Sequence, residues 1–259
     1  MDMQDQISYL RSRWEIEPRF IQLYQKLGDL DSPFLDKLSK ARKISWDEFL
    51  RNRNKTPLWQ RKGYPFSIWE PYWDPIEEIK DFPTIERGTQ TYYDLRGFKV
   101  FPVSFYGAKL NRFDLSFSYG GGMHLIAVSF CSECIFEQVD YNTGPLHYGF
   151  EKCIFSNSKF RHISFSPNVI ANCQFTNCKF SKSEFTSSDI MNTKFDGCDF
   201  REASLGGSRI SDTRFVRCNF RQALFEKNQT MYLNSEFIDC DLRNTTLGIL
   251  PPHEIIRQS

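Results

Sequence analysis

The sequence lacks an excess of either charge and lacks long apolar runs. It holds 33 Lys and Arg against 32 Asp and Glu in 259 residues, so its net charge of +1 points to no particular class of partner. It contains no run of roughly 18 apolar residues such as a membrane-spanning helix needs, and MDMQDQISYLRSRW has no apolar segment typical of a secretory signal. We therefore expect a cytoplasmic protein that does not bind membranes.

Histidine is scarce, and no arrangement of catalytic residues is evident. The four histidines are scattered and have no recognisable motif around them. The glycine run at residues 120–122 neither follows a clear strand nor opens a helix, which favours a loop over a phosphate-binding turn. The pair Cys131 and Cys134 is half of a zinc site without a second pair at a suitable spacing. We predict no enzyme activity, no metal and no cofactor.

Tryptophan is absent from the last two thirds of the chain, where cysteine is concentrated. All five tryptophans lie in the first third, and seven of the eight cysteines lie after Cys131. This change in composition predicts a domain boundary near Gly88. The expected parts are an N-terminal helical domain at 1–88, a solenoid at 89–250 and a C-terminal tail at 251–259.

Helix signals predict the content of the N-terminal domain. Apolar residues recur at helical spacing behind Pro18, and this helix is expected to stop at Gly28, which readily takes a left-handed conformation. A second helix is expected from Ser32 and a third from Ser45, which opens a capping box. The prolines and aromatics of residues 57–83 predict an irregular wrap over an apolar surface.

An apolar residue recurs at every fifth position from Phe155 onward, and a small residue lies two positions before each one. The same types of apolar and small residue recur at every twentieth position, and within residues 226–234 the five-residue repeat shifts by two positions. A five-residue unit buries nothing alone, so four units are expected to form one square coil that stacks on the next, about 4.7 to 4.9 Å away. The cysteines in the small positions are then buried free thiols. The predicted inward residues are Phe155, Phe160, Phe165, Ile170, Phe175, Phe180, Phe185, Ile190, Phe195, Phe200, Leu205, Ile210, Phe215, Phe220, Phe225, Phe237, Leu242 and Leu247.

Units such as CQFTN, CKFSK, CDFRE, CNFRQ and CDLRN resemble the pentapeptide-repeat proteins, whose units read roughly A-(D/N)-(L/F)-x-x. The resemblance implies a mainly β fold, a right-handed quadrilateral β-helix, here with an N-terminal α-helical domain. It extends from about Tyr93 to Leu250 and is most regular from about residue 150. The stretches near 118–124 and 138–149 depart from the repeat, and we expect them to be outgrowths.

One face of the predicted solenoid is basic. The residues that flank the column beginning at Phe160 include seven basic and three acidic side chains, a net charge of plus four, whereas the other faces are close to neutral. We interpret this face either as a solvated surface whose arginine stems cover strand edges or as a binding surface for a carboxylate-rich or phosphate-rich partner. Its candidate binding residues are Arg161, Lys179, Lys182, Arg201, Arg221 and Arg243.

A second basic cluster lies at residues 37–62, with nine basic and two acidic side chains. The interleaved Trp46 and Trp59 are suited to stacking on bases, and they are equally suited to filling a small helical core. Nucleic-acid binding and a charged helix face therefore both stay open. The candidate residues are Lys40, Arg42, Lys43, Arg51, Arg53 and Lys55.

We expect a non-catalytic macromolecule-binding or scaffold protein that binds another protein through the outer faces of the solenoid and the N-terminal domain. The family resemblance implies an alternative, because some pentapeptide-repeat proteins imitate duplex DNA and bind gyrase. Such mimicry needs a strongly negative rod, whereas residues 91–259 hold eighteen basic and seventeen acidic side chains. A homodimer is left open, because the last coil ends in a strand edge that must be paired or covered.

Overall fold

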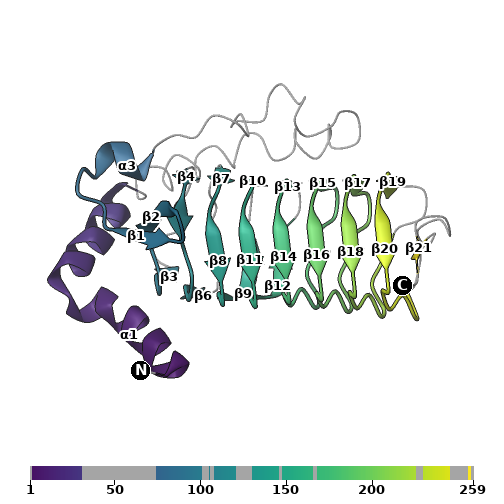
Figure 1. Ribbon diagram of the computed structural model, residues 1–259, viewed down its shortest axis with the longest axis horizontal. Helices are drawn as coiled ribbons and strands as arrows, with labels where there is room; N and C mark the ends of the chain where they lie inside the picture. Colours follow the sequence, from purple (N-terminus) through teal and green to yellow (C-terminus); the bar gives the residue numbers. More distant parts are fainter. Residues whose placement is uncertain are drawn as a thin grey trace, which may run out of the picture.

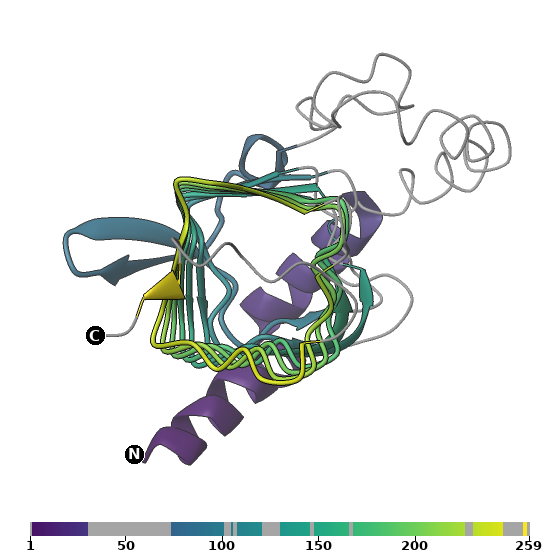
Figure 2. The ribbon, with the colours of Figure 1, turned by 90° about the vertical axis from the view of Figure 1, so that its right-hand side faces the viewer.

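The repeat folds into a four-walled solenoid with helices at its N-terminal end (Figure 1). Viewed along its axis, the solenoid has a square cross-section (Figure 2). These features confirm the predicted mainly β fold with N-terminal helices. The computed structural model describes residues 2–30, 74–100, 105, 108–120, 130–145, 148–165, 168–225, 230–245 and 256–257.

Each five-residue unit makes one side of a coil and one corner. In the unit around Phe175, Cys173 and Phe175 are buried in the core while Gln174 between them is exposed, the alternation expected of an extended backbone. Asn177 then takes a φ of 52°, a left-handed conformation that Asn tolerates better than most residues. Because a positive φ recurs two positions after the inward residue at the described corners from Asn157 to Gln222, the chain turns once every five residues.

In the described residues, three of the walls contain regular strands, and the strand pairs other than β1 with β2 are parallel. The ten-stranded wall consists of β1 (Thr84–Arg87), β2 (Gln90–Asp94), β5 (Phe113–Asp114), β8 (Ile135–Glu137), β11 (Ile154–Ser156), β14 (Gln174–Thr176), β16 (Lys194–Asp196), β18 (Arg214–Val216), β20 (Glu236–Ile238) and β21 (Ile256–Arg257). The seven-stranded wall consists of β4 (Lys109–Asn111), β7 (Phe130–Ser132), β10 (Tyr148–Glu151), β13 (Asn168–Ala171), β15 (Asp189–Met191), β17 (Arg209–Ser211) and β19 (Met231–Leu233).

The third wall is the predicted basic face, and we call it the basic wall. Its strands are β3 (Lys99–Val100), β6 (Tyr119–Gly120), β9 (Asp140–Pro145) and β12 (Lys159–Ser164). It continues upward as single bridges that pair, in order, Lys159, Lys179, Asp199, Asn219 and Asp241. The fourth wall is held by similar bridges, which pair Ser164, Glu184, Ser204 and Leu224 in order.

The strand register places like side chains on top of one another. Phe195 pairs with Phe175 below it and Phe215 above it. Its ring lies parallel to theirs, with centroid distances of 4.6 and 4.9 Å and interplanar angles of 9° and 7°. After the predicted two-residue slip, Phe237 pairs with Phe215 in the same column. The vertical spacing of twenty residues and the slip are both confirmed.

The first coils are less regular than the repeat, but two stretches lie in the wall where we expected outgrowths. Tyr119–Gly120 is strand β6 and Asp140–Pro145 is strand β9, and the two strands pair with each other within the basic wall. The prediction of outgrowths is wrong for these residues. The phase changes because Phe136 pairs with Phe155, so this coil spans nineteen residues and not twenty.

The described residues of the N-terminal part contain more helix than we predicted for them. Helix α1 (Met3–Ile16) was not expected, although Asp2 caps it by accepting a hydrogen bond from the backbone N–H of Asp5. A second helix covers residues 18–30, so the predicted stop at Gly28 is wrong. Residues 75–78 of the predicted irregular wrap form the short helix α3 (Pro75–Glu78). The helices expected from Ser32 and Ser45, and the wrap before residue 74, lie outside the described residues.

The N-terminal helices close the first coil and share its core. Trp14 and Phe20 are buried in one cluster with Phe98, and the centroid of the Trp14 ring lies 5.0 Å from that of Phe98. Strands β1 and β2 form a hairpin through the predicted boundary at Gly88 and project from the side of the solenoid (Figure 2). No break in structure therefore falls at Gly88.

The eight cysteines are free thiols, as predicted, and seven of them are buried. The Sγ atom of Cys153 donates to the carbonyl oxygen of Cys131 in the coil below at 3.4 Å, and Cys173 does the same to Phe150. Cys134 occupies the small position before Phe136 and is fully buried. Among the helices in the described parts of the chain, none combines the length and apolar character that a membrane crossing requires.

Candidate binding surface on the basic wall

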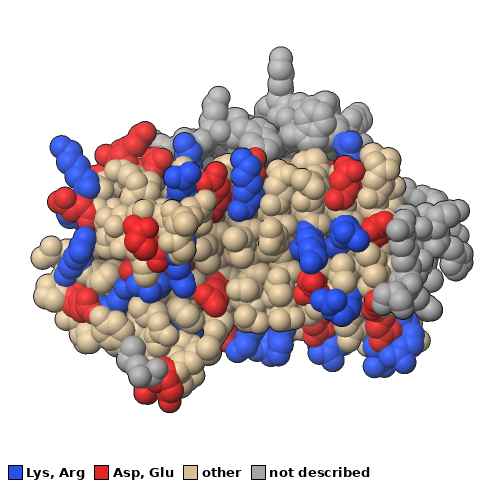
Figure 3. Space-filling view, in the orientation of Figure 1, with Lys and Arg blue, Asp and Glu red and all other residues tan. Residues whose placement is uncertain are grey.

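All six predicted residues of the basic wall are exposed at the positions that flank its inward column. Lys and Arg side chains gather along the lower edge of the solenoid in Figure 3, the side on which β9 and β12 lie in Figure 1. The register determines their arrangement, because residues twenty apart in sequence are vertical neighbours. The wall therefore presents cations at fixed heights, about 4.8 Å apart from coil to coil.

Two of the arginines are held by carboxylates of their own units. The guanidinium of Arg201 donates to both carboxylate oxygens of Asp199 at 2.9 and 2.7 Å, and Arg243 makes the same pair of bonds to Asp241. These hydrogen bonds and the positive charge of Arg243 lower the pKa of Asp241 to about 2. A D-x-R unit on this wall thus forms an internal bidentate ion pair.

Two of the lysines on this wall also lie near carboxylates. The Nζ atom of Lys159 lies 3.1 Å from a carboxylate oxygen of Asp140 in the coil below. The Nζ atom of Lys182 lies 3.7 Å from a carboxylate oxygen of Glu202 in the coil above. Both pairs are exposed, so each contributes only about 0 to 1 kcal/mol to folding.

Three cations form no close ion pair: within the described residues, no carboxylate lies within ion-pair distance of Arg161, Lys179 or Arg221. The reason is visible in the column that contains Asp199 and Asp241, because Asn219 takes the place of the aspartate beside Arg221. Asn219 accepts a hydrogen bond from the backbone N–H of Arg221 at 3.1 Å but supplies no negative charge. The same column holds Lys179 in the coil below Asp199. At longer range, the charge of Lys179 acts to lower the pKa of Asp199, and that of Arg221 acts to lower the pKa of Asp241.

The sequence therefore predicted the positions of these side chains but not their pairing. Arg201, Arg221 and Arg243 do lie on successive coils, yet only Arg221 among them lacks a carboxylate partner in the described part of the chain. The residue two positions before each arginine distinguishes the paired arginines from Arg221: it is aspartate in the D-x-R units and asparagine in the N-x-R unit. The second predicted cluster, at Lys40, Arg42, Lys43, Arg51, Arg53 and Lys55, lies outside the described residues.

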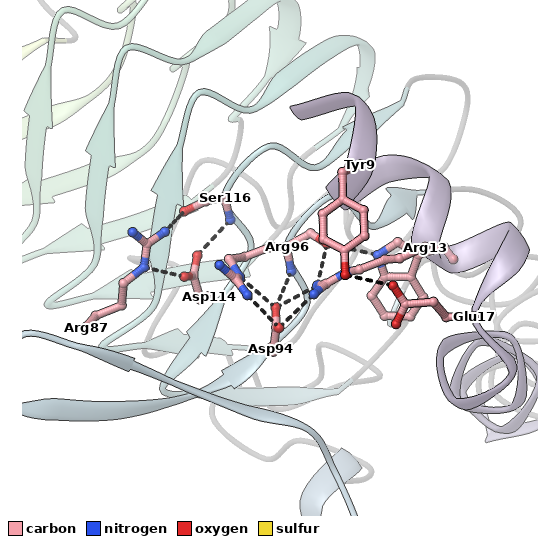
Figure 4. A network of polar contacts seen from close by, with 9 residues as sticks. Tyr9, Arg13, Glu17, Arg87, Asp94, Arg96, Asp114 and Ser116 are labelled. Atoms are coloured by element: carbon pink, nitrogen blue, oxygen red, sulfur yellow. Dashed lines mark hydrogen bonds and ion pairs between the residues drawn. The ribbon is translucent and has the colours of Figure 1, made fainter. Parts of the chain in front are cut away.

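A buried polar network at the cap was not predicted (Figure 4). Arg13 of α1 donates to both carboxylate oxygens of Asp94 at 2.9 and 2.7 Å, and Arg96 donates to the same carboxylate at 3.0 Å. Burial acts to raise the pKa of Asp94, but the two guanidinium groups outweigh burial and hold it at about 2. Trp14 also donates from Nε1 to the carbonyl oxygen of Arg96. The network locks the helical cap onto the first coil.

A second, separate ion pair lies in the next coil. Arg87 donates to the buried carboxylate of Asp114 at 2.7 Å, and the backbone N–H of Ser116 donates to the same carboxylate at 2.9 Å. These residues lie in packed structure, and we assign them to stability. Within the described residues, no group of three or more His, Cys, Asp or Glu side chains is placed to hold a metal ion.

Comparison with known proteins supports the assignment of the repeat. The family model "Pentapeptide repeats (8 copies)" matches residues 170–207 and 185–222. No curated protein matches the chain. Residues 170–222 are the part in which the inward phenylalanine columns and the positive-φ corners are most regular.

Solved structures of low identity are similar to parts of the chain. A trypsin-treated form of QnrB1, a plasmid-mediated fluoroquinolone resistance protein, is 15% identical, with 62% of this chain and 86% of QnrB1 covered and a TM-score of 0.37. HetL, a pentapeptide-repeat protein involved in heterocyst differentiation regulation in the cyanobacterium Nostoc sp. strain PCC 7120, is 11% identical. The match covers 62% of this chain and 86% of HetL, with a TM-score of 0.26. Residues 170–222 of this chain therefore contain pentapeptide repeats, which are wound into four-walled coils.

Proposed function

We propose that this chain is a non-catalytic cytoplasmic scaffold that binds another protein through the outer surface of its solenoid. The observation that supports this most directly is the packing of the core. The inward residues from Phe136 to Phe225 are at most about one per cent exposed in the described coils, and most of them are phenylalanines. Because the interior of those coils is packed core, recognition has to take place outside it.

The outer walls are well suited to binding a macromolecule. Successive coils are joined by backbone hydrogen bonds, such as that from the N–H of Phe180 to the carbonyl oxygen of Asp199 at 2.7 Å. Outward side chains therefore stand in straight rows on a rigid support. A rigid surface loses little conformational freedom when a partner binds, which favours affinity.

Charge argues against the DNA-mimic alternative. A protein that imitates duplex DNA needs rows of negative side chains, whereas the basic wall exposes the cations Arg161, Lys179 and Arg221, which form no ion pairs among the described residues. We place the mimic second for this reason. Nucleic-acid binding through residues 37–62 stays a separate prediction.

Site-specific photo-crosslinking in cells tests the proposal. A benzophenone amino acid is placed at one outward position on each wall of the full chain, and nuclease-treated lysates are examined for crosslinked partners. A discrete protein adduct from at least one wall supports a protein-binding scaffold. Adducts that form equally in a lysate denatured with urea before irradiation, or no adduct from any wall, would contradict it. The positions are Thr176 on the ten-stranded wall, Met191 on the seven-stranded wall, Ser181 on the basic wall and Glu184 on the fourth wall.

A further inference from the structure

We propose that the basic wall binds an acidic segment of a partner protein, with Arg161, Lys179 and Arg221 as the residues that contact its carboxylates. This inference rests on the proposed scaffold function and names the surface and the chemistry of the partner. It starts from the division of the wall into cations that already form ion pairs with carboxylates and cations that form no ion pair within the described residues.

The three unpaired cations form one site that spans several coils. Arg161 follows Lys159 by two residues, and Arg221 follows Asn219 by two, and those two neighbours are joined through the bridges at Lys179 and Asp199. Arg161 and Arg221 are therefore three coils apart, roughly 14 Å along the axis at about 4.8 Å per coil. Lys179 stands one coil above Arg161 in the adjacent row.

Each of these side chains is free to reorganise around a ligand. Arg161, Lys179 and Arg221 are all exposed, so a partner can reach them without moving the backbone. Arg201 and Arg243 are different, because each would have to give up two hydrogen bonds of 2.7 to 2.9 Å to its own aspartate. A carboxylate from a partner gains more by contacting the unpaired guanidinium groups, which can bind it in a bidentate manner.

The acidic residues on the same wall favour a protein over a nucleic acid. Asp199, Glu202 and Asp241 lie among the cations, and their ion pairs keep them in place. A nucleic-acid strand carries one negative charge per roughly 3.4 Å, so its phosphates would also meet these carboxylates. A protein segment can instead place its carboxylates at three points and neutral or basic side chains opposite Asp199.

The spacing limits the length of the segment. An α-helix rises about 1.5 Å per residue, so about nine residues of helix span the roughly 14 Å between Arg161 and Arg221. An extended segment needs only four or five residues, at about 3.3 Å each. Either form presents a short acidic motif, and the length of the motif distinguishes the two.

A pair of matched variants tests the site. The basic-wall variant carries Arg161→Gln, Lys179→Gln and Arg221→Gln. The control carries Lys194→Gln, Arg214→Gln and Arg217→Gln on the ten-stranded wall, which removes the same three positive charges from cations that are already ion-paired. Equal far-ultraviolet circular dichroism and melting temperatures within a few degrees establish that both variants are folded.

Fluorescence anisotropy is measured with a labelled twenty-residue peptide in which glutamates at every fourth position are separated by neutral residues, and with a labelled twenty-base-pair DNA duplex at low salt. We expect the full chain to bind the acidic peptide, the basic-wall variant to bind it at least tenfold more weakly, and the control to change the affinity less than twofold. Equal weakening by both variants, or no binding of the acidic peptide by the full chain, would overturn the inference. Tighter binding of DNA that is lost in the basic-wall variant would also overturn it, in favour of a nucleic acid.

The crosslinking experiment separates this inference from the proposed function. A protein adduct at Ser181 that disappears in the basic-wall variant supports both. An adduct confined to Thr176, Met191 or Glu184 supports the scaffold function and contradicts the basic wall as its binding surface. The absence of adducts at all four positions contradicts both.

Discussion

Truncating Phe195 tests the central physical claim, which is that stacked phenylalanines hold the coils together. The side chain is fully buried, and its ring lies between the parallel rings of Phe175 and Phe215. It also meets the rings of Phe180 and Phe200 edge-on, with centroid distances of 6.2 and 5.3 Å. Phe195→Ala therefore removes one member of several aromatic pairs at once.

The magnitude follows from these contacts. Replacing a buried phenylalanine by alanine typically lowers the free energy of unfolding by about 3 to 5 kcal/mol, and more where the cavity cannot collapse. Strand β16 is fixed by backbone hydrogen bonds to β14 on one side and β18 on the other, so the wall cannot move in to fill the cavity that the missing ring leaves. Each lost ring pair adds about 0.5 to 1.5 kcal/mol beyond the area term. We expect the effect at or above the upper end, about 5 kcal/mol.

Urea denaturation followed by circular dichroism measures the effect, with Lys194→Ala as the matched control on the same strand. Lys194 points outward and its side chain is 55% exposed in an ion pair with Asp196, so its loss is expected to cost less than about 1 kcal/mol. Similar losses for the two variants would show that the inward and outward positions are assigned wrongly, and the stacked-core reasoning would fail.

Three further predictions concern the cap and the thiols. Because Asp94 has a folded pKa of about 2 against an ordinary 3.8, its carboxylate stabilises the fold above about pH 4, and about 2 kcal/mol is lost as the pH falls through 2. Asp94→Asn should remove that part of the pH dependence of the unfolding free energy. Because the substitution leaves Arg13 without its ion pair, it should also lower the unfolding free energy by about 3 to 5 kcal/mol near neutral pH. An unfolding free energy that keeps the same dependence on pH below 4 would contradict the role of the ion pair. Gly97→Ala should lower the unfolding free energy by about 1 to 3 kcal/mol more than Gly88→Ala. Both glycines have a positive φ, but of the two only the Cβ at position 97 would meet the backbone, at the Leu10 carbonyl oxygen. Equal effects in thermal melts would show that α1 does not pack against Gly97. Seven of the thiols are buried and only that of Cys240 is partly exposed, so a thiol-specific disulfide reagent should modify at most Cys240 in the native protein and all eight thiols in guanidinium chloride. The pKa of Cys240 is raised by its hydrogen bond with Cys218 and by burial, so its native reaction should be slow, and Cys240→Ser should abolish it; rapid reaction of several native thiols would mean that the column is not closed.

The cap shows why the N-terminal third was predicted less well than the coils. A single helix such as α1 has no repeat to reinforce its signal, and its buried residues Arg13 and Trp14 contact partners about eighty positions away. A buried arginine is rare unless it is paired, so Arg13 was not identifiable as a core residue before Asp94 was placed beside it. Its long-range partner is a property of the docked helix and not of the local sequence.

The solenoid itself was largely determined by the sequence, since many units in one phase specify the same inward column, the same corner and the same vertical neighbour. Phe175, Phe195 and Phe215 had to stack once the coil was known to contain four units, and the buried thiols followed from the same spacing. The sequence also distinguishes Arg201, which follows Asp199 by two residues, from Arg221, which follows Asn219 by two. Tertiary structure alone decided the ion pairs between coils, such as that of Lys182 with Glu202, because whether two charged groups on different coils lie within reach depends on side-chain geometry.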